Sequence, residues 1–238
     1  MNSKSGFLQK VLAPQTVRVS VHFEPGVSAV AEQVDVLAYV KQQEVSRIIY
    51  AGDLQVEEIG RMARHFRKFQ GLSRVEILQR LQPSLQKVTG RPLAEGNLRK
   101  YAKDALRLMA ALELIDGDFY ITLDGGKLCR YLDTDKQRFI DYSAKLLLTK
   151  AGWLAVVTEV NQLRRGFYYA ASQKLLVETV FVNLKERKLI KRNDSWRMAA
   201  LIDCLVYMKI LKPWDSVSKR YDVDLERLYD ILARKTFT

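Results

Sequence analysis

Histidine and cysteine are scarce in this chain of 238 residues, which holds two of each. His22 and His65 have neither a cysteine nor paired carboxylates nearby at ligand spacing, and a metal site needs such a cluster. Cys129 and Cys204 each stand in an apolar helical pattern, which is typical of buried thiols in a reducing compartment. The sequence therefore predicts no metal site, no disulfide framework and a cytoplasmic location.

Long apolar runs are also missing. The best one, Met198 to Leu211, is interrupted by Asp203 and Lys209 and is too short to span a bilayer. The first twenty residues contain Lys4 and Lys10 but no continuous apolar segment, so no secretory signal is expected. We expect no association with a membrane.

Signatures of catalysis are weak. Gly125-Gly126-Lys127 lacks the long glycine loop and the Ser/Thr of a phosphate-binding loop, and no Ser-His-acid arrangement is supported by spacing. A nuclease needs carboxylates that hold a divalent ion, and Asp116, Asp118 and Lys127 form one such set. We expect a protein that is not an enzyme and uses no cofactor; a metal-dependent nuclease is the catalytic alternative.

Positive charge is what the sequence has in excess. Lys and Arg number 39 against 27 Asp and Glu, which gives a formal net charge of +12. The segment from Arg61 to Lys103 contains eleven basic residues and two acidic ones. Charge concentrated on adjacent helices indicates a surface for a polyanion, and a merely solvated helix face is the alternative interpretation.

The chain before this basic segment has a different pattern. Val17 to Phe23 alternates apolar and polar residues, which predicts a strand, and Pro25-Gly26 closes it. Ser28 to Gln43 predicts an amphipathic helix, and Arg47 to Ala51 is a candidate second strand. We expect a small α/β element over residues 1–54, which serves either as a cap or in dimerisation.

Two helices are predicted next. The first spans Val56 to Phe69, with its apolar side chains at helical spacing. The second begins at Ser73, because Ser73 and Glu76 fit a capping box in which each side chain satisfies a free backbone amide. We expect this second helix to end near Leu81, since Pro83 follows.

A long helix and a hairpin follow. Ala94 to Leu114 repeats apolar residues at three-four spacing, which predicts one buried face. Asp116-Gly117 is a strong signal for a hairpin turn. The residues after the turn alternate, which predicts a half-buried strand with three inward side chains: Phe119, Ile121 and Leu123.

This order of helix, helix, long helix and hairpin resembles a winged-helix domain, a variant of helix-turn-helix, over about Val56 to Leu132. The resemblance predicts a domain over residues 55–133 and implies that the long helix lies in the major groove of DNA. The loop from Gln82 to Leu93 is longer than the usual tight turn. The matching polar face of the long helix carries Asn97, Arg99, Lys100, Lys103 and Arg107.

These side chains suit two kinds of contact. Arginine donates a bidentate pair to guanine and asparagine pairs with adenine, so base contacts are expected from Asn97, Arg99 and Lys103. Lys100 and Arg107 are expected to contact phosphates. The hairpin tip, Asp116-Gly-Asp118, is acidic and would be repelled by the DNA backbone, so we do not expect it to enter a minor groove.

A second copy of the pattern is predicted downstream. Ala105 to Ile115 resembles Leu201 to Leu211, because in both an apolar helix ends in a β-prone pair and a turn. We therefore predict a connecting helix within residues 134–151 and a second winged-helix-like domain over residues 152–238. Its expected elements are helices at Trp153 to Leu163, Ser172 to Arg187 and Val223 to Lys235, and strands at Lys212 to Asp215 and Lys219 to Val223.

Candidate nucleic-acid-binding residues come from both predicted domains. Most are cations on predicted helices; Trp196 is included because an exposed indole stacks on a base. The full set is Arg61, Arg64, Lys68, Lys87, Arg91, Asn97, Arg99, Lys100, Lys103, Arg107, Lys188, Lys191, Arg192, Trp196 and Arg197.

The sequence thus predicts a mainly α fold with small β-hairpins, in which tandem winged-helix-like units follow a small α/β N-terminal element. The expected function is non-catalytic DNA binding, by a transcription regulator or the DNA-engaging subunit of a larger complex. Double-stranded DNA is the expected partner, and RNA is a variant that phosphate attraction alone does not separate from it. A protein–protein adaptor that uses winged-helix folds is the main alternative, and a homo-oligomer or a protein complex stays open.

Overall fold

The computed structural model describes residues 48–51, 54–90, 95–164, 173–190, 195–215 and 220–233. The chain divides into two compact units, Met1–Glu44 and Val45–Thr238, and every described residue belongs to the second. The strand predicted at Val17 to Phe23 and the helix predicted at Ser28 to Gln43 lie outside the described residues.

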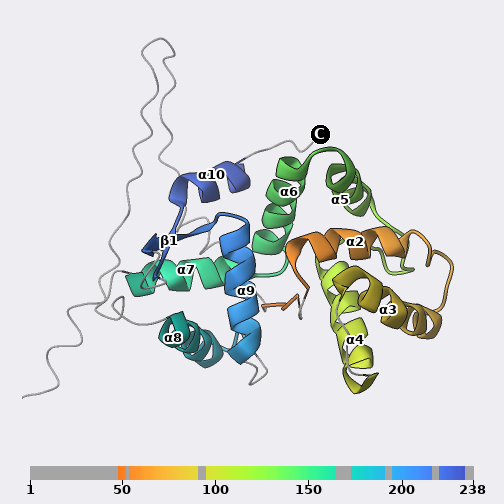
Figure 1. Cartoon of the computed structure of the whole chain (residues 1–238), viewed down its shortest axis with the longest axis horizontal. Helices are drawn as coiled ribbons and strands as arrows, with labels where there is room; N and C mark the ends of the chain where they lie inside the picture. Colours follow the sequence, from red (N-terminus) through yellow and green to blue (C-terminus); the bar gives the residue numbers. More distant parts are fainter. Residues whose placement is uncertain are drawn as a thin grey trace, which may run out of the picture. The chain divides into compact units, whose positions relative to one another are not determined.

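The described part is mainly helical with one small sheet, as expected (Figure 1). Strands β1 and β2 pair antiparallel, with Leu211 opposite Val223. None of these helices is long and apolar enough to cross a bilayer. In chain order the elements are α2 (Val56–Phe66), α3 (Arg74–Thr89), α4 (Glu95–Ala111), α5 (Leu123–Thr134), α6 (Lys136–Thr149), α7 (Trp153–Arg164), α8 (Gln173–Glu186), α9 (Ser195–Tyr207), β1 (Leu211–Asp215), β2 (Arg220–Val223) and α10 (Leu225–Ala233).

Helix α3 begins as predicted and ends later than predicted. Ser73 and Glu76 form the capping box, in which Glu76 Oε2 accepts from the Ser73 amide at 2.8 Å. The expected end near Leu81 is wrong, because the helix continues through Pro83 to Thr89. Pro83 removes only one hydrogen bond of the helix. The helix continues because the buried residues before and after Pro83 lie on one face and stay packed. Gly90 ends the helix in the left-handed conformation, with φ 63°.

The hairpin after α4 is smaller than predicted. Ile115 and Ile121 form an isolated antiparallel bridge, and Asp116 Oδ1 accepts from the Tyr120 amide at 2.8 Å across the turn. The expected strand does not reach Leu123, because Thr122 caps a helix there and Leu123 becomes the first residue of α5. Its side chain is 86% exposed instead of half-buried.

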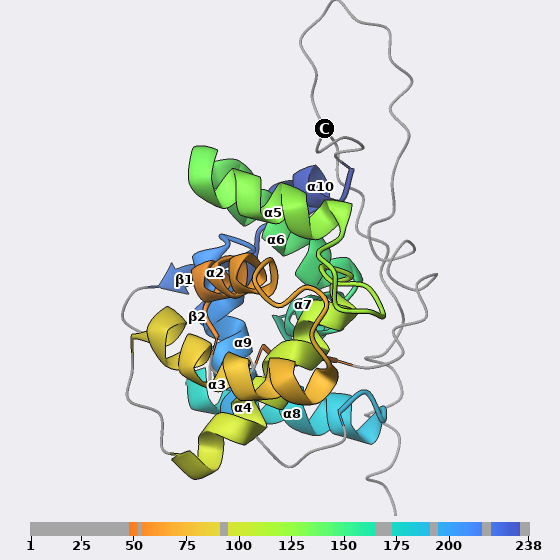
Figure 2. The same cartoon turned by 90° about the vertical axis from the view of Figure 1, so that its right-hand side faces the viewer.

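Helix α2 lies at the centre of the packing. It contacts α3 and α5, and α3 in turn packs along α4. Its Val56, Ile59, Met62, Ala63 and Phe66 are buried on one side, and burying each larger side chain contributes about 1.5–3 kcal/mol. Figure 2 shows α6 next to α5, and α6 also contacts α7 and α10, so it joins the first helices to the last ones.

Helices α4 and α9 end with the same backbone geometry. The Leu114 amide donates to Met109 O at 2.9 Å, and the Ile210 amide donates to Leu205 O at 3.0 Å. The residues before these amides, Glu113 and Lys209, have positive φ values of 55° and 59°. Helix α8 ends in the same way, since Lys188 has φ 60° and the Leu189 amide donates to Leu184 O at 3.0 Å, so this geometry by itself does not mark a repeat.

The chain then returns in the same way after both helices. The Thr122 amide donates to Leu114 O at 3.0 Å, and the Asp224 amide donates to Ile210 O at 2.9 Å. Thr122 and Asp224 each precede the next helix, α5 or α10. We call residues 56–134, with α2 to α5, the first repeat, and residues 153–233, with α7 to α10, the second repeat.

The short segment at residues 48–51 ties the second repeat to the rest of the unit. Ile48 N donates to Leu189 O at 3.1 Å, Ile49 N donates to Ala151 O at 3.0 Å, and Trp153 Nε1 donates to Ile49 O at 2.8 Å. The strand predicted at Arg47 to Ala51 does not form over residues 48–51, because these hydrogen bonds go to loops and a side chain instead of a neighbouring strand.

Candidate nucleic-acid interface

Helix α4 separates its apolar and cationic side chains onto two faces. Ala102, Ala105 and Met109 are buried, and they lie at the three-four spacing that brings side chains to one side of a helix. The exposed cations are Arg99, Lys100, Lys103 and Arg107. Successive helical residues are rotated by about 100°, so these four fall within roughly a quarter to a third of the circumference. We call them the α4 stripe.

Most of the α4 stripe has no ion pair with another described residue. No described carboxylate forms an ion pair with Arg99, Lys100 or Lys103. Arg107 lies 3.7 Å from Asp104, one turn away on the same helix. Asn97 is also exposed, in the first turn of α4. The stripe therefore places four cationic side chains at the surface, one of them beside a carboxylate.

A second group of cations surrounds His65 on α2. The pKa of His65 is lowered, first because the ring is partly buried and then because Lys68, Lys87 and Arg64 lie nearby. Because Lys87 belongs to α3, this shift places cations of two helices close to one imidazole. We call Arg61, Arg64, Lys68 and Lys87 the α2–α3 cluster, and all four are exposed.

Arg64 differs from the other members of this cluster, because its guanidinium donates to the Asp133 carboxylate on α5. Both side chains are about half exposed, and surface ion pairs contribute only about 0–1 kcal/mol. Arg64 thus has a partner that an incoming anion must compete with, whereas the described structure shows no such pair for Arg61, Lys68 or Lys87.

The candidates in the second repeat are placed differently. Arg197 is 3% exposed, and its Nη2 donates to Asp104 Oδ2 of α4 at 3.0 Å. Because it lies between the two repeats, it does not reach a surface ligand, and we remove it from the candidate set.

The other candidates of the second repeat are exposed or undescribed. Trp196 is 45% exposed, with the Arg197 guanidinium 5.2 Å from its ring centre, and Lys188 is exposed after α8. Arg91, Lys191 and Arg192 lie outside the described residues.

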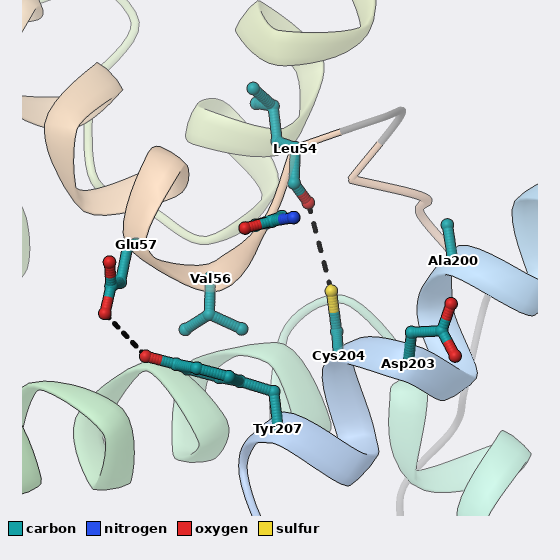
Figure 3. Close-up of a pocket in the computed structure, with 8 residues that line it drawn as sticks. Leu54, Val56, Glu57, Ala200, Asp203, Cys204 and Tyr207 are labelled. Atoms are coloured by element: carbon teal, nitrogen blue, oxygen red, sulfur yellow. Dashed lines mark hydrogen bonds between the residues drawn. The ribbon is translucent and has the colours of Figure 1, made fainter. Parts of the chain in front are cut away.

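A pocket of about 430 Å³ lies between the start of α2 and helix α9 (Figure 3). Tyr207 Oη donates to Glu57 Oε1 at 2.6 Å, and the Cys204 thiol points to Leu54 O at 3.9 Å. The hydrogen bonds from Tyr207 and Lys136 lower the pKa of Glu57. Lys136 Nζ lies 3.0 Å from Glu57 Oε1, so the carboxylate is already paired with a cation.

The chemistry of this pocket is not nucleophilic. Burial raises the pKa of the Cys204 thiol to about 12, so it stays protonated at neutral pH and is a poor nucleophile. Burial and the hydrogen bond to Glu57 also raise the pKa of Tyr207. Over the ranges that the structure describes, no group of three or more His, Cys, Asp or Glu side chains is arranged to hold a metal ion.

Two exposed cations that are not in the candidate set belong to the first repeat, one at the end of α2 and one on α5. Arg67 is the C-cap residue of α2, and Arg130 lies on α5. Neither was expected, because the winged-helix pattern directs attention to the long helix and not to the helix after the hairpin. The three-residue spacing of Lys127 and Arg130 is the signal that would have indicated Arg130.

No protein-family model, curated protein or solved structure matches this chain.

Proposed function

We propose that this protein is a non-catalytic DNA-binding protein and that its two repeats are winged-helix-like units. The order of helices and hairpin, and the shared backbone hydrogen bonds after α4 and α9, support the proposal for the fold. The α4 stripe carries the proposal for the function, because it concentrates exposed cations on the helix that corresponds to the reading helix, and three of them form no ion pair with a described residue.

In this proposal the stripe binds one duplex by two kinds of contact. Lys100 and Arg107 neutralise phosphates and release counterions, which gives affinity that does not depend on sequence. Asn97, Arg99 and Lys103 lie nearer the start of α4 and approach base edges. The α2–α3 cluster adds phosphate contacts beside the groove, where Lys68 and Lys87 stand close to His65.

A charge-neutralising variant tests the role of the stripe. Arg99→Gln/Lys100→Gln/Lys103→Gln removes three cations, and Lys136→Gln/Arg138→Gln/Lys212→Gln removes three others from α6 and β1 that are also exposed. Fluorescence anisotropy with a short duplex is measured over a salt series. The stripe variant should weaken binding and reduce the slope of log K against log salt by about 0.9 for each phosphate that it no longer neutralises.

The control variant shows whether DNA contacts the stripe itself or is attracted only by the net positive charge of the protein. If only the net charge matters, both variants bind the duplex equally weakly, and the stripe is not an interface. If the unsubstituted chain does not bind duplex even at low salt, DNA binding itself is wrong. Binding of single-stranded RNA and duplex DNA under the same conditions decides between the two kinds of nucleic acid.

A second candidate function is a protein–protein adaptor, and one observation favours it. Helix α9, the counterpart of α4, contacts another part of the chain, since the exposed Tyr207 donates to Glu57 of α2 and the buried Cys204 thiol lies 3.9 Å from Leu54 O. In the adaptor alternative, a winged-helix-like unit uses such a helix to pack on another protein. A partner complex that survives nuclease treatment, together with the absence of duplex binding, supports the adaptor.

A further inference from the structure

A hollow of about 700 Å³ opens between the end of α2, the hairpin and α5. Three cationic side chains line it: Arg67, Lys127 and Arg130. Lys127 and Arg130 lie about one turn apart on α5 and share a face of that helix. Arg67 comes from the C-terminal end of α2, so cations from two separate elements converge on one space.

Basic side chains outnumber acidic ones in this lining. Asp133 is the one carboxylate among the described residues that line the hollow, and Arg64 already binds it. Asp124 lies in the first turn of the same helix and outside the lining. Tyr142 and Lys150 hold its carboxylate at 2.6 and 2.9 Å, and Lys127 also interacts with it electrostatically. The lining itself thus has three cationic side chains and one carboxylate.

The floor of the hollow leaves room for a ligand. Gly126 is part of the lining, and a Cβ atom added to it would meet nothing within 4 Å. Leu123 stands in the lining with its side chain almost fully exposed. The volume falls in the range of about 300–1,000 Å³ that is usual for sites of small organic ligands, which is larger than a lone inorganic ion needs.

We propose that this hollow binds the phosphodiester backbone of a nucleic acid, through Arg67, Lys127 and Arg130, as a contact separate from the α4 stripe. Arginine holds phosphate oxygens by paired hydrogen bonds, and the lysine ammonium adds a point charge. The inference rests on the proposed DNA binding, because it assigns a second contact to the same ligand.

The test maps binding residue by residue on the full chain. A short duplex is titrated into isotope-labelled protein, and backbone amide shifts are followed at Gly126 and Thr122 for the hollow and at Lys100 and Lys103 for the stripe. The titration is repeated with Arg67→Gln/Lys127→Gln/Arg130→Gln and with Lys136→Gln/Arg138→Gln, which removes cations from the adjacent helix α6. Circular dichroism shows that each variant is folded.

We expect shifts at both sites in the unsubstituted chain. The hollow variant should abolish the shifts at Gly126 and Thr122, weaken duplex binding roughly tenfold and lower the salt slope by about 0.9 for each phosphate released. The charge-preserving variant Lys127→Arg/Arg130→Lys should keep both the shifts and the affinity. Shifts at the stripe alone would overturn this inference and leave the proposed function standing. Shifts at the hollow alone would retain the hollow and overturn the role of α4.

Discussion

The two repeats share a backbone pattern and differ in what their third helix presents. Helices α4 and α9 end in matching hydrogen bonds, so their residues correspond one to one back from those ends. By this correspondence, Lys100, Lys103 and Arg107 of the α4 stripe occupy the same helical positions as Trp196, Ala199 and Asp203 in α9. The second set contains no cation.

The difference lies in the residue types and not in exposure. On the equivalent side of α9, Trp196 is 45% exposed and Asp203 is also exposed. The contacts between the repeats come from other positions of α9, where Tyr207 reaches Glu57 and the buried Arg197 reaches Asp104. A surface helix thus carries cations in the first repeat, and an indole and a carboxylate in the second.

The largest expected effect comes from the ion pair that joins the repeats. Arg197→Met removes the buried partner of the Asp104 carboxylate, which also lies 3.7 Å from Arg107, and should lower the free energy of unfolding by about 3 to 5 kcal/mol. Urea denaturation measures the decrease. The double variant Asp104→Leu/Arg197→Met should recover much of it, since no charge then stays buried. A decrease below about 1 kcal/mol in the single variant would show that the repeats are held by other contacts.

Two adjacent glycines, Gly125 and Gly126, test how closely the start of α5 packs against the hairpin of the first repeat. A Cβ on Gly125 would overlap the Leu114 carbonyl oxygen and lie 2.6 Å from Ile121 Cγ1, whereas one on Gly126 meets nothing. Gly125→Ala should therefore destabilise the chain by about 1–3 kcal/mol. Gly126→Ala should be neutral or stabilise it by up to about 1 kcal/mol, because alanine favours the helix. Thermal melting compares the two, and equal melting temperatures would contradict the close packing.

Substituting one cation in each repeat tests whether only the first repeat binds duplex DNA. Lys103→Gln removes one charge of the α4 stripe, and Lys188→Gln removes one exposed charge of the second repeat. If the first repeat alone binds duplex, Lys103→Gln should reduce the salt slope by about 0.9, and Lys188→Gln should leave it unchanged. Anisotropy titrations over a salt series measure both. Equal reductions would mean that the repeats contribute equally.

The smallest effect concerns His65. Burial and then the nearby cations lower its pKa, so the neutral ring is favoured in the folded chain. The unfolded chain binds the proton more readily, so this group's contribution to stability is present above pH about 6.5 and is lost as the pH falls through the lowered pKa. Phosphates bound at the α2–α3 cluster offset those cations and should raise the pKa of His65. Ring-proton NMR, assigned with His65→Gln, measures it with and without duplex, and an unchanged pKa would place the DNA elsewhere.

Local signals in the sequence predicted most of the elements correctly. The capping box at Ser73 and Glu76, the three-four spacing of α4 and the recurrence of its end at Leu201 to Leu211 all act over a few residues, so they are readable without a partner segment. Three predicted elements differ from the structure. Helix α3 continues through Pro83, and Leu123 starts a helix because Thr122 caps it locally. Residues 48–51 form no strand, because their hydrogen bonds go to loops and to the Trp153 side chain.

The candidate site was predictable only in part. The exposure of Arg99, Lys100 and Lys103 follows from amphipathic spacing, because the opposite face of the same helix must be buried. The pairing of Arg197 with Asp104 does not follow from spacing, since the two residues belong to different helices whose contact the sequence does not show. The same holds for Arg64 and Asp133, which pair across α2 and α5.

The sequence by itself determined which segments are helical, where the pattern recurs and that cations gather between Arg61 and Lys103. Those properties depend on residue spacing, capping and composition, which act within a single segment. Only the tertiary structure decided which cations stay exposed, which pair with carboxylates and which converge with Arg67 around the hollow on α5. The physical reason is that charge becomes available or neutralised through the segments packed beside it, and those come from distant parts of the chain.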